Sequence, residues 1–422
     1  MGEHAGGTAW FDDARLGVFV HWGHTSQQGI ELSWPLAGGT AVGGMSCAAV
    51  PIDRYHASAA TFSPRPGAMA RIVEQAAAAG ARYAVFTTKH HDGFAMWPSA
   101  LTDWTIAHTP YDGDLVAEFV DACRRHDLRV GLYHSLSDWH HPDYPALSEA
   151  DLPYAYIAYR RADPDAWARY LEVLHGQVRE LLTDYGRIDV LWFDGQWERT
   201  PQEWRAAELR EMIRELQPDC LVNDRLPVPA DFDTPEQFLP PEPPGGRWEM
   251  CLTMGHSWAY QPDDRYQSAS RLVHTLAEVA GKGGNLLLNV GPDGDGDVPP
   301  PQAERLGAIG SWMARNGEAI IGTEPGLAPW QWYGPSTRRG DRVYLVCVAR
   351  PYESVTVRGV PVRRVERVSH LATGTDLAFT SRLSVIDELI NADPLGELTI
   401  VLGDDLIDPL ATVVAVDIAP GR

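Results

Sequence analysis

The sequence is poor in cysteine and in positive charge, and it lacks long apolar runs. Its five cysteines are far apart, odd in number and in no metal-ligand spacing, which argues against a disulfide framework and a structural zinc site. Lysine and arginine total 35 against 57 acidic residues, so the formal net charge is -22. Nucleic acid and anionic membrane surfaces are therefore not expected as partners.

Targeting signals are also missing from the printed sequence. Residues 1–7 have neither a basic region nor an apolar run, so no signal peptide is visible, and no window approaches the length of a membrane span. We expect a cytoplasmic protein, unless a leader has been removed. The sequence does not indicate an oligomeric state.

What the sequence does contain is an alternation of short apolar segments with amphipathic ones. The predicted strands are 15–23, 81–88, 128–135, 187–194, 220–225, 248–254 and 285–290. The predicted helices are 66–80, 114–127, 164–185, 201–216, 268–281 and 302–317. Such alternation indicates a parallel sheet with crossover helices. A closed (β/α)8-like TIM barrel fits best, with an eighth strand that cannot be placed; an open doubly wound sheet is the alternative.

Two segments depart from this alternation. Residues 231–246 contain five prolines and two glycines and are predicted to be a loop. From about residue 325, short segments rich in Val and Leu are separated by turns, which predicts a small antiparallel β-sandwich. We therefore expect a catalytic barrel over 1–325 and a C-terminal β-sandwich domain over 326–422.

Polar side chains follow nearly every predicted barrel strand. Asp194 ends the apolar strand 190–193, and the other strand ends carry His21 and Trp22, His90 and His91, His134, and Asp224 and Arg225. In a barrel these residues converge on one mouth, where such enzymes keep their chemistry. One interpretation is a metal-dependent hydrolase with His and Asp ligands. The adjacent histidines 90 and 91 argue against it, because neighbours on an extended strand point to opposite sides.

Glycoside hydrolysis is the favoured interpretation and needs no cofactor or metal. It requires two carboxyl groups, which lie about 5 Å apart in the retaining version. Imidazole, indole and guanidinium groups then bind the hydroxyls and the face of a neutral sugar ring.

The chain resembles the α-L-fucosidases of glycoside hydrolase family 29, in order and wording, from about Trp10 to Gly322. The segments that carry the resemblance are HWG at 21–23, TTKHHDGFAMW at 87–97, LYHSLSDWHHPDYP at 132–145, VLWFDG at 190–195, NDR at 223–225, TPE at 234–236, WEMC at 248–251 and GGNLLLNVGPDGDG at 283–296. The resemblance implies a barrel, retention of configuration, no metal, and a fucosylated oligosaccharide or glycoconjugate as substrate.

The resemblance also implies site residues. Asp194 matches the family nucleophile. The expected sugar-binding residues are His21, Trp34, His90, His91, His134, Trp192 and Arg225. His134 takes a position where other members often have Tyr. Many members read Glu-Trp where this chain has Glu31-Leu32-Ser33-Trp34, so the role of Glu31 is open. Phe94 is one apolar neighbour that could receive the methyl group of fucose.

The acid/base is expected to be Glu236 of the TPE motif, in the proline-rich loop. Glu242 in the same loop and Glu249 in WEMC are its rivals, although Glu249 lies within a predicted strand and suits an orienting role. Two other functions stay open besides a retaining fucosidase: the metal-dependent barrel hydrolase, and a catalytically weak fucose-binding relative. The cleaved linkage, the leaving group and the tolerance of related sugars such as α-L-galactosides are not indicated.

Overall fold

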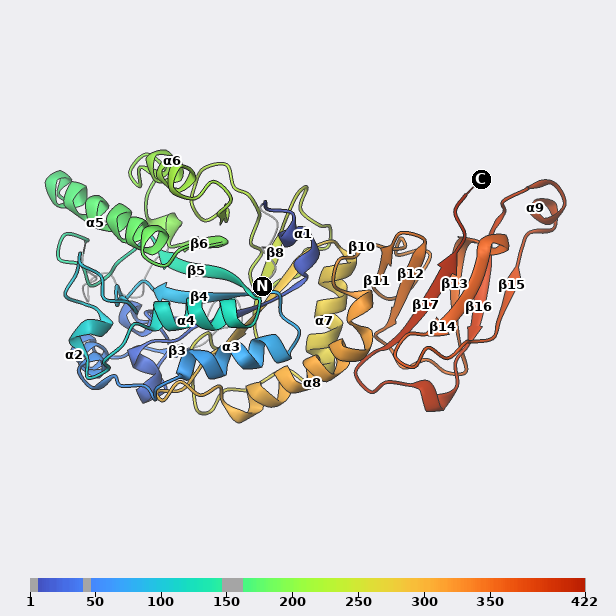
Figure 1. Cartoon of the computed structure of the whole chain (residues 1–422), viewed down its shortest axis with the longest axis horizontal. Coiled ribbons are helices and arrows are strands. Elements are labelled where there is room, and N and C mark those ends of the chain that lie inside the picture. Colours follow the sequence, from blue (N-terminus) through green and yellow to red (C-terminus); the bar gives the residue numbers. More distant parts are fainter. Residues whose placement is uncertain (1–6, 41–46, 146–161, 422) are drawn as a thin grey trace.

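A computed structural model describes residues 7–40, 47–145 and 162–421 of the chain (Figure 1). Its largest sheet is parallel, in the order β7-β6-β5-β4-β1-β9-β8. The strands are β1 (Leu16–Val20), β4 (Tyr83–Lys89), β5 (Arg129–Ser135), β6 (Val190–Asp194), β7 (Leu221–Val222), β8 (Glu249–Thr253) and β9 (Asn285–Val290). All seven lie within or beside the strands predicted from the sequence.

The predicted helices are confirmed with shifted ends. They are α3 (Ala68–Ala78), α4 (Leu115–Arg125), α5 (Pro164–Thr183), α6 (Ala206–Leu216), α7 (Ala269–Gly281) and α8 (Pro300–Asn316). Helices α4, α5 and α7 begin where Asp114, Asp163 and Ser268 accept backbone hydrogen bonds as N-caps. Short elements complete this part: α1 (Trp10–Ala14), α2 (Ile52–Ala57), β2 (Gly39–Thr40) and β3 (Cys47–Ala48).

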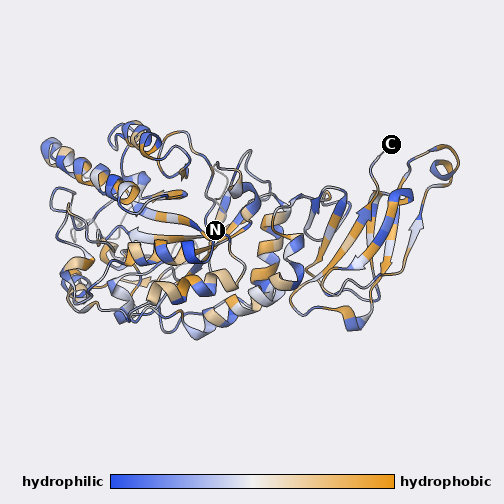
Figure 2. Cartoon of the chain, in the orientation of Figure 1, coloured by the Kyte–Doolittle hydropathy of each residue, from blue (hydrophilic) through white to orange (hydrophobic). Residues whose placement is uncertain are grey.

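The two faces of the curled sheet contain different side chains, as a two-residue period requires. Phe19, Tyr133, Val190 and Trp192 belong to the cluster inside the barrel. Their neighbours, such as Leu132 and Leu191, belong to the larger core between the sheet and its helices. These helices carry both hydrophobic and hydrophilic residues (Figure 2). The residues inside the barrel support the side chains that reach its mouth.

The strand that the sequence did not reveal lies in the segment 231–237. Isolated parallel bridges join Phe232 to Asn223 after β7, and Glu236 to Cys251 in β8. The Gln237 amide donates to the Cys251 carbonyl at 2.9 Å, and the Cys251 amide donates to the Pro235 carbonyl at 3.2 Å. The segment therefore closes the barrel between its two edge strands, and the prediction of a loop over its whole length was wrong.

The C-terminal region forms two antiparallel sheets, as predicted. The first has the order β10-β11-β12-β17-β14 and the second the order β13-β16-β15. The bounds are β10 (Glu324–Pro325), β11 (Ser336–Arg339), β12 (Arg342–Cys347), β13 (Ser354–Pro361), β14 (Val365–His370), β15 (Phe379–Arg382), α9 (Val385–Ile390), β16 (Leu395–Val401) and β17 (Thr412–Ile418). The boundary between residues 325 and 326 stays a prediction.

The larger sheet of this region is covered on both faces. Val343 and Leu345 of β12 pack toward the smaller sheet, whereas Tyr344 and Val346 join the core of the barrel helices. The indole of Trp312 in α8 donates to the Ala411 carbonyl at 2.8 Å. The sandwich is therefore packed against the barrel through α7 and α8 (Figure 1). In the described ranges, no helix is both long and apolar enough to cross a membrane.

Candidate active site

A cavity of about 250 Å³ lies at the carboxyl ends of the barrel strands. It is smaller than the roughly 300–1,000 Å³ typical of pockets for drug-sized ligands, so it suits a single ring. Its walls combine two carboxylates, one guanidinium, two imidazoles and many aromatic rings. The lining residues are Phe19, His21, Trp34, His90, Tyr133, Trp192, Asp194, Trp197, Arg225, Glu236, Gln237, Cys251 and Trp258.

Asp194 is the last residue of β6 and reaches the cavity because it shares the inner face with Trp192. Its Oδ2 accepts a hydrogen bond from the Tyr133 hydroxyl at 3.0 Å, and its Oδ1 accepts one from Arg225 Nη1 at 2.9 Å. Gly195 follows with a φ of 82°, and a Cβ there would lie 2.5 Å from Ser137 Oγ. Only glycine therefore allows this sharp turn after the carboxylate.

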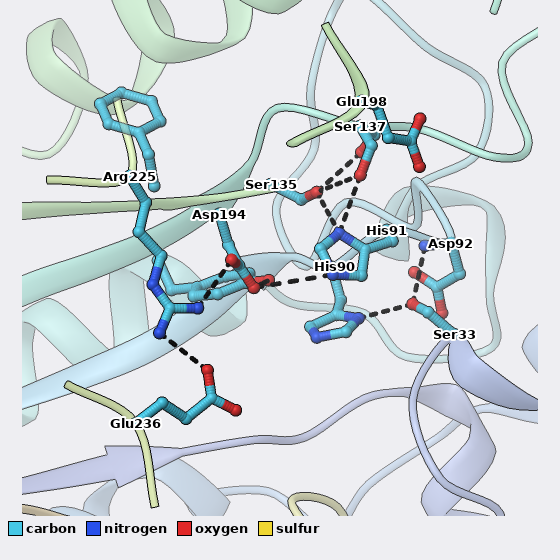
Figure 3. Close-up of polar contacts among 12 residues, drawn as sticks. Ser33, His90, His91, Asp92, Ser135, Ser137, Asp194, Glu198, Arg225 and Glu236 are labelled. Carbon is cyan, nitrogen blue, oxygen red and sulfur yellow. Dashed lines mark hydrogen bonds and ion pairs between the residues drawn. The ribbon is translucent and has the colours of Figure 1, made fainter. Parts of the chain in front are cut away.

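Glu236 approaches from the closing segment and shares a partner with Asp194. Arg225 Nη2 donates to Glu236 Oε2 at 2.7 Å, so one guanidinium joins the two carboxylates (Figure 3). Burial would lower the pKa of Arg225, but attraction to Asp194 and Glu236 raises it well above its ordinary value. The guanidinium also lies 4.6 Å from the ring centroid of Trp192. The arrangement holds two carboxyl groups side by side with a fixed positive charge between them.

The histidines at the mouth are neutral. His21 and His90 line the cavity, and burial lowers the pKa of each well below its ordinary range. A neighbouring histidine lowers each pKa further: His90 acts on His21, and His91 acts on His90. His21 Nδ1 lies 2.7 Å from Asn289 Oδ1, which fixes its ring. A neutral imidazole can donate one hydrogen bond and accept another, which suits recognition of hydroxyl groups.

His91 lies behind the nucleophile candidate rather than on the cavity wall. Its Nε2 is 3.6 Å from Asp194 Oδ2, and its Nδ1 contacts the hydroxyls of Ser135 and Ser137 (Figure 3). Burial, followed by the charge of Arg225, lowers its pKa to about 3. Strand β4 ends at Lys89, so the strand alternation expected for His90 and His91 does not apply, and their rings lie 4.3 Å apart.

Besides His91, two residues expected to contact the sugar do not line the cavity, His134 and Phe94. His134 is fully buried on the outer face of β5, where its ring packs 5.9 Å from that of Trp97. Its neighbour Tyr133 points inward in its place, because adjacent strand residues face opposite sides. Phe94 packs against His24, Phe62 and Trp104 instead of lining the cavity. The apolar wall is formed by other aromatic residues.

The glutamates whose roles the sequence did not decide lie in different places. Glu31 is buried and accepts hydrogen bonds from the amides of Leu32, Trp258 and Ala259, so it anchors a neighbouring turn. Glu249 lies inside the barrel and accepts from Tyr83 Oη and Trp192 Nε1, which matches the orienting role expected of it. Glu242 is exposed and does not line the cavity. Of the four glutamates considered, Glu236 alone lines this cavity.

Six lining residues were missed from the sequence: Phe19, Tyr133, Trp197, Gln237, Cys251 and Trp258. Phe19 lies two residues before His21, so the strand period contained a usable signal. Whether the other five residues reach the cavity depends on where each strand ends and on the path of the segment 231–237. Cys251 is no nucleophile, because burial and then the charge of Glu236 raise the pKa of its thiol well above the ordinary range.

Metal binding finds no support in the side chains around the mouth. Throughout residues 7–40, 47–145 and 162–421, no three His, Cys, Asp or Glu side chains are grouped to hold a metal ion. The polar groups of the cavity instead hydrogen-bond to one another and to the backbone.

The fold and this cavity define a barrel enzyme with paired carboxylates, the class to which glycoside hydrolases belong. The sequence profile of the α-L-fucosidase family matches residues 4–318. The tissue α-L-fucosidase of Homo sapiens is 31% identical over 400 residues, covering 88% of this chain and 82% of that protein. The chain belongs to the α-L-fucosidase family, glycoside hydrolase family 29.

Solved structures of α-L-fucosidases share both parts of the fold. Isoenzyme 1 from Paenibacillus thiaminolyticus is 35% identical, with a TM-score of 0.82 over 98% of both chains. The enzyme from Bacteroides thetaiotaomicron, trapped as a covalent intermediate with 2-fluoro-fucosyl fluoride, is 27% identical, with a TM-score of 0.81 over 98% of this chain and 96% of that one. The predicted barrel followed by a sandwich is confirmed.

Proposed function

We propose that the chain is a retaining α-L-fucosidase that releases terminal α-L-fucosyl residues from fucosylated glycosides. The observation that carries the proposal is the contact chain from Asp194 through Arg225 to Glu236, at the wall of a cavity sized for one ring. Family membership supplies the identity of the sugar. The covalent intermediate trapped in the Bacteroides relative supports a route through a fucosyl-enzyme.

In the first step, the Asp194 carboxylate forms a bond to the anomeric carbon while the bond to the leaving oxygen breaks. Glu236 gives its proton to that oxygen. Arg225 contacts Glu236 through Oε2 only, so Oε1 is available to carry the proton. In the second step, Glu236 takes a proton from water, which attacks the anomeric carbon and frees Asp194. Two inversions at the same carbon retain its configuration.

The rest of the cavity binds the sugar. His21 and His90 are uncharged and offer hydrogen bonds to ring hydroxyls, whereas Trp34, Trp192 and Trp258 provide flat apolar surfaces. The methyl group of a 6-deoxy sugar fits against this aromatic wall rather than against Phe94. A cytoplasmic location stays a prediction.

A trapping experiment tests the proposal. The protein is incubated with 2-fluoro-fucosyl fluoride, and intact mass spectrometry should show one added 2-fluorofucosyl group, which peptide mapping places on Asp194. Asp194→Asn should remain folded, take up no label and lose turnover of an aryl α-L-fucoside. A label on another carboxylate would overturn the nucleophile assignment. Absence of turnover by the unchanged protein would favour the catalytically weak fucose-binding relative.

Chelation separates the remaining alternative. The aryl α-L-fucosidase activity should survive prolonged treatment with EDTA, because hydroxyl recognition explains the histidines without coordination. Loss of activity that only a particular divalent ion restores would favour the metal-dependent hydrolase. Equal hydrolysis of an aryl α-D-galactoside would contradict the sugar specificity.

A further inference from the structure

A strained turn lies directly beside the cavity, at Ser33. Its φ of 59° and ψ of −48° are unusual for a residue with a side chain. The Trp34 amide donates to the Leu32 carbonyl at 2.6 Å, which makes the segment a three-residue γ-turn centred on Ser33. The γ-turn with a positive central φ is the rare and strained form. The turn directs Trp34 to the cavity wall.

Three hydrogen bonds hold Ser33 in this conformation. Its amide donates to Tyr55 Oη at 2.6 Å, and its Oγ accepts from the Asp92 amide at 2.8 Å. The same Oγ lies 2.6 Å from His90 Nδ1 (Figure 3). Strain that is held by several contacts next to a binding pocket points to a functional constraint. The contact with His90 shows what that constraint is.

The hydroxyl proton of Ser33 decides which nitrogen of His90 carries a hydrogen. Ser33 is fully buried, and a buried hydroxyl proton needs an acceptor. Its Oγ has hydrogen-bond distance and angle to the Asp92 amide, which can only donate, and to His90 Nδ1. It also interacts with Tyr55 Oη, which already accepts from the Ser33 amide at 2.6 Å. Because Oγ lies 2.6 Å from Nδ1 and Tyr55 Oη already accepts from the Ser33 amide, we assign the hydroxyl proton to the bond with Nδ1. Because a neutral imidazole carries one ring proton, that proton is on Nε2.

We propose that Ser33 is a positioning residue for sugar recognition: it holds His90 as the Nε2–H tautomer and so presents a hydrogen-bond donor to one ring hydroxyl of the substrate. The imidazole of His90 is held from a second side by Tyr133, whose ring stacks on it at 5.4 Å and 9°. Nε2 lies on the side of the ring away from Ser33, and the ring lines the cavity (Figure 3). The inference rests on the proposed function and adds the source of one specificity contact.

Nuclear magnetic resonance reads the tautomer without substrate. In protein labelled with ¹⁵N in its histidine rings, the His90 signals should show a protonated Nε2 and an unprotonated Nδ1. Ser33→Ala removes the donor, so the same signals should move toward a mixture of tautomers. A protonated Nδ1 in the unchanged protein would overturn the inference, whatever the enzymatic activity. This result is therefore separate from a failure of the proposed function.

Kinetics separate the hydroxyl from the strained backbone. Ser33→Ala and Ser33→Gly both remove the hydroxyl, but glycine adopts the positive φ without strain. Both variants should lose about tenfold in kcat/KM on an aryl α-L-fucoside, the effect of one hydrogen bond, mainly through KM. Thr373→Ala is the matched control: it removes a hydroxyl 2.8 Å from His370 Nδ1 in the C-terminal region and should leave kcat/KM unchanged.

Substrates that lack one hydroxyl each identify the contact. For one monodeoxy aryl fucoside, Ser33→Ala and the unchanged protein should have equal kcat/KM, since the hydroxyl that needs the donor is missing. On the other analogues the tenfold difference should persist. If Ser33→Gly and the unchanged protein had equal kcat/KM, the inference would be overturned, and Ser33 would serve only to form the turn. A loss of equal size on every analogue would also overturn the inference.

Discussion

Among single residues, Tyr133 shares with Arg225 the direct contacts to the Asp194 carboxylate. Its hydroxyl donates to Asp194 Oδ2 at 3.0 Å, and burial, followed by the negative charge of Asp194, raises its pKa well above the ordinary value. The phenol therefore stays protonated and remains a donor throughout the working range of pH. It holds the carboxylate through Oδ2, whereas Arg225 holds it through Oδ1.

Removing this donor should slow catalysis without unfolding the protein. We expect Tyr133→Phe to lower kcat/KM on an aryl α-L-fucoside by about 10- to 100-fold, the size of one hydrogen bond to a charged group. Tyr185→Phe is the control, because Tyr185 makes the same type of contact with Asp114, at 2.7 Å, away from the cavity. Equal activity of Tyr133→Phe and the unchanged protein would exclude a role in orienting Asp194.

The acid/base role of Glu236 predicts a dependence on the leaving group. An activated aryl group needs little protonation, whereas a sugar needs much. Glu236→Ala should therefore suppress cleavage of fucosylated oligosaccharides far more than cleavage of an aryl fucoside. Added azide should restore the aryl activity, since a small anion attacks the fucosyl-enzyme without a general base. Similar losses on both substrates, without rescue, would contradict the assignment.

At this scale the sequence identified the correct types of residue but not all of their directions. Trp192 and Asp194 are two residues apart on one strand, so their common face was predictable. Tyr133 and His134 are adjacent, and which of them faces inward depends on where β5 begins and ends. The position of His91 behind Asp194 could not be predicted for a similar reason, because β4 ends at Lys89, just before His90. The sequence pattern alone does not show at which residue a strand ends.

Among the elements, the turn at 257–259 is anchored by Glu31. The carboxylate accepts from the amides of Leu32 at 2.9 Å, Trp258 at 2.7 Å and Ala259 at 2.8 Å. Glu31→Gln replaces one acceptor oxygen by an amino group that faces these donors. We expect KM for an aryl fucoside to rise about 5- to 10-fold and the melting temperature to fall, because Trp258 loses its support at the cavity wall.

A second glutamate provides the control for this prediction. Glu180 accepts from the Ala100 amide, the Trp97 indole and the Ser99 hydroxyl, so it also anchors a loop, but outside the cavity. Glu180→Gln should lower the melting temperature and leave KM unchanged. If both variants changed KM alike, the effect would reflect general loss of stability rather than the position of Trp258.

The elements themselves were largely predictable because their patterns are regular. Continuous apolar runs gave the parallel strands, and amphipathic runs with capping residues gave the helices. The segment 231–237 was missed because it contains a proline and polar residues and pairs through isolated bridges only. Tertiary contacts with β7 and β8, rather than local preference, make it the closing strand. It also brings Glu236 into the cavity.

For the whole molecule, burial of titratable groups links folding to pH. Burial lowers the pKa of five wholly buried histidines: His21, His24, His90, His91 and His134. Unfolding lets them take up protons below about pH 6.5, so they cost stability as the pH falls from there toward 3. Burial raises the pKa of Glu31 and Glu249 to about 7 and that of Asp92 to about 6. These carboxyls act in the opposite direction, because unfolding releases their protons and stability falls as the pH rises from about 4 to 7.

The histidines outnumber the carboxyls, so stability should fall on acidification. Each histidine that takes up a proton on unfolding contributes about 1.4 kcal/mol per pH unit to this slope. At about pH 6.5 the unfolded histidines are still half protonated, so stability should keep rising to about pH 7, where proton release from Glu31 and Glu249 offsets it. Urea unfolding at several pH values measures this profile. His134→Gln, on the outer face of β5, should reduce the acid slope by about one proton; an unchanged slope would show that His134 is charged in the folded protein.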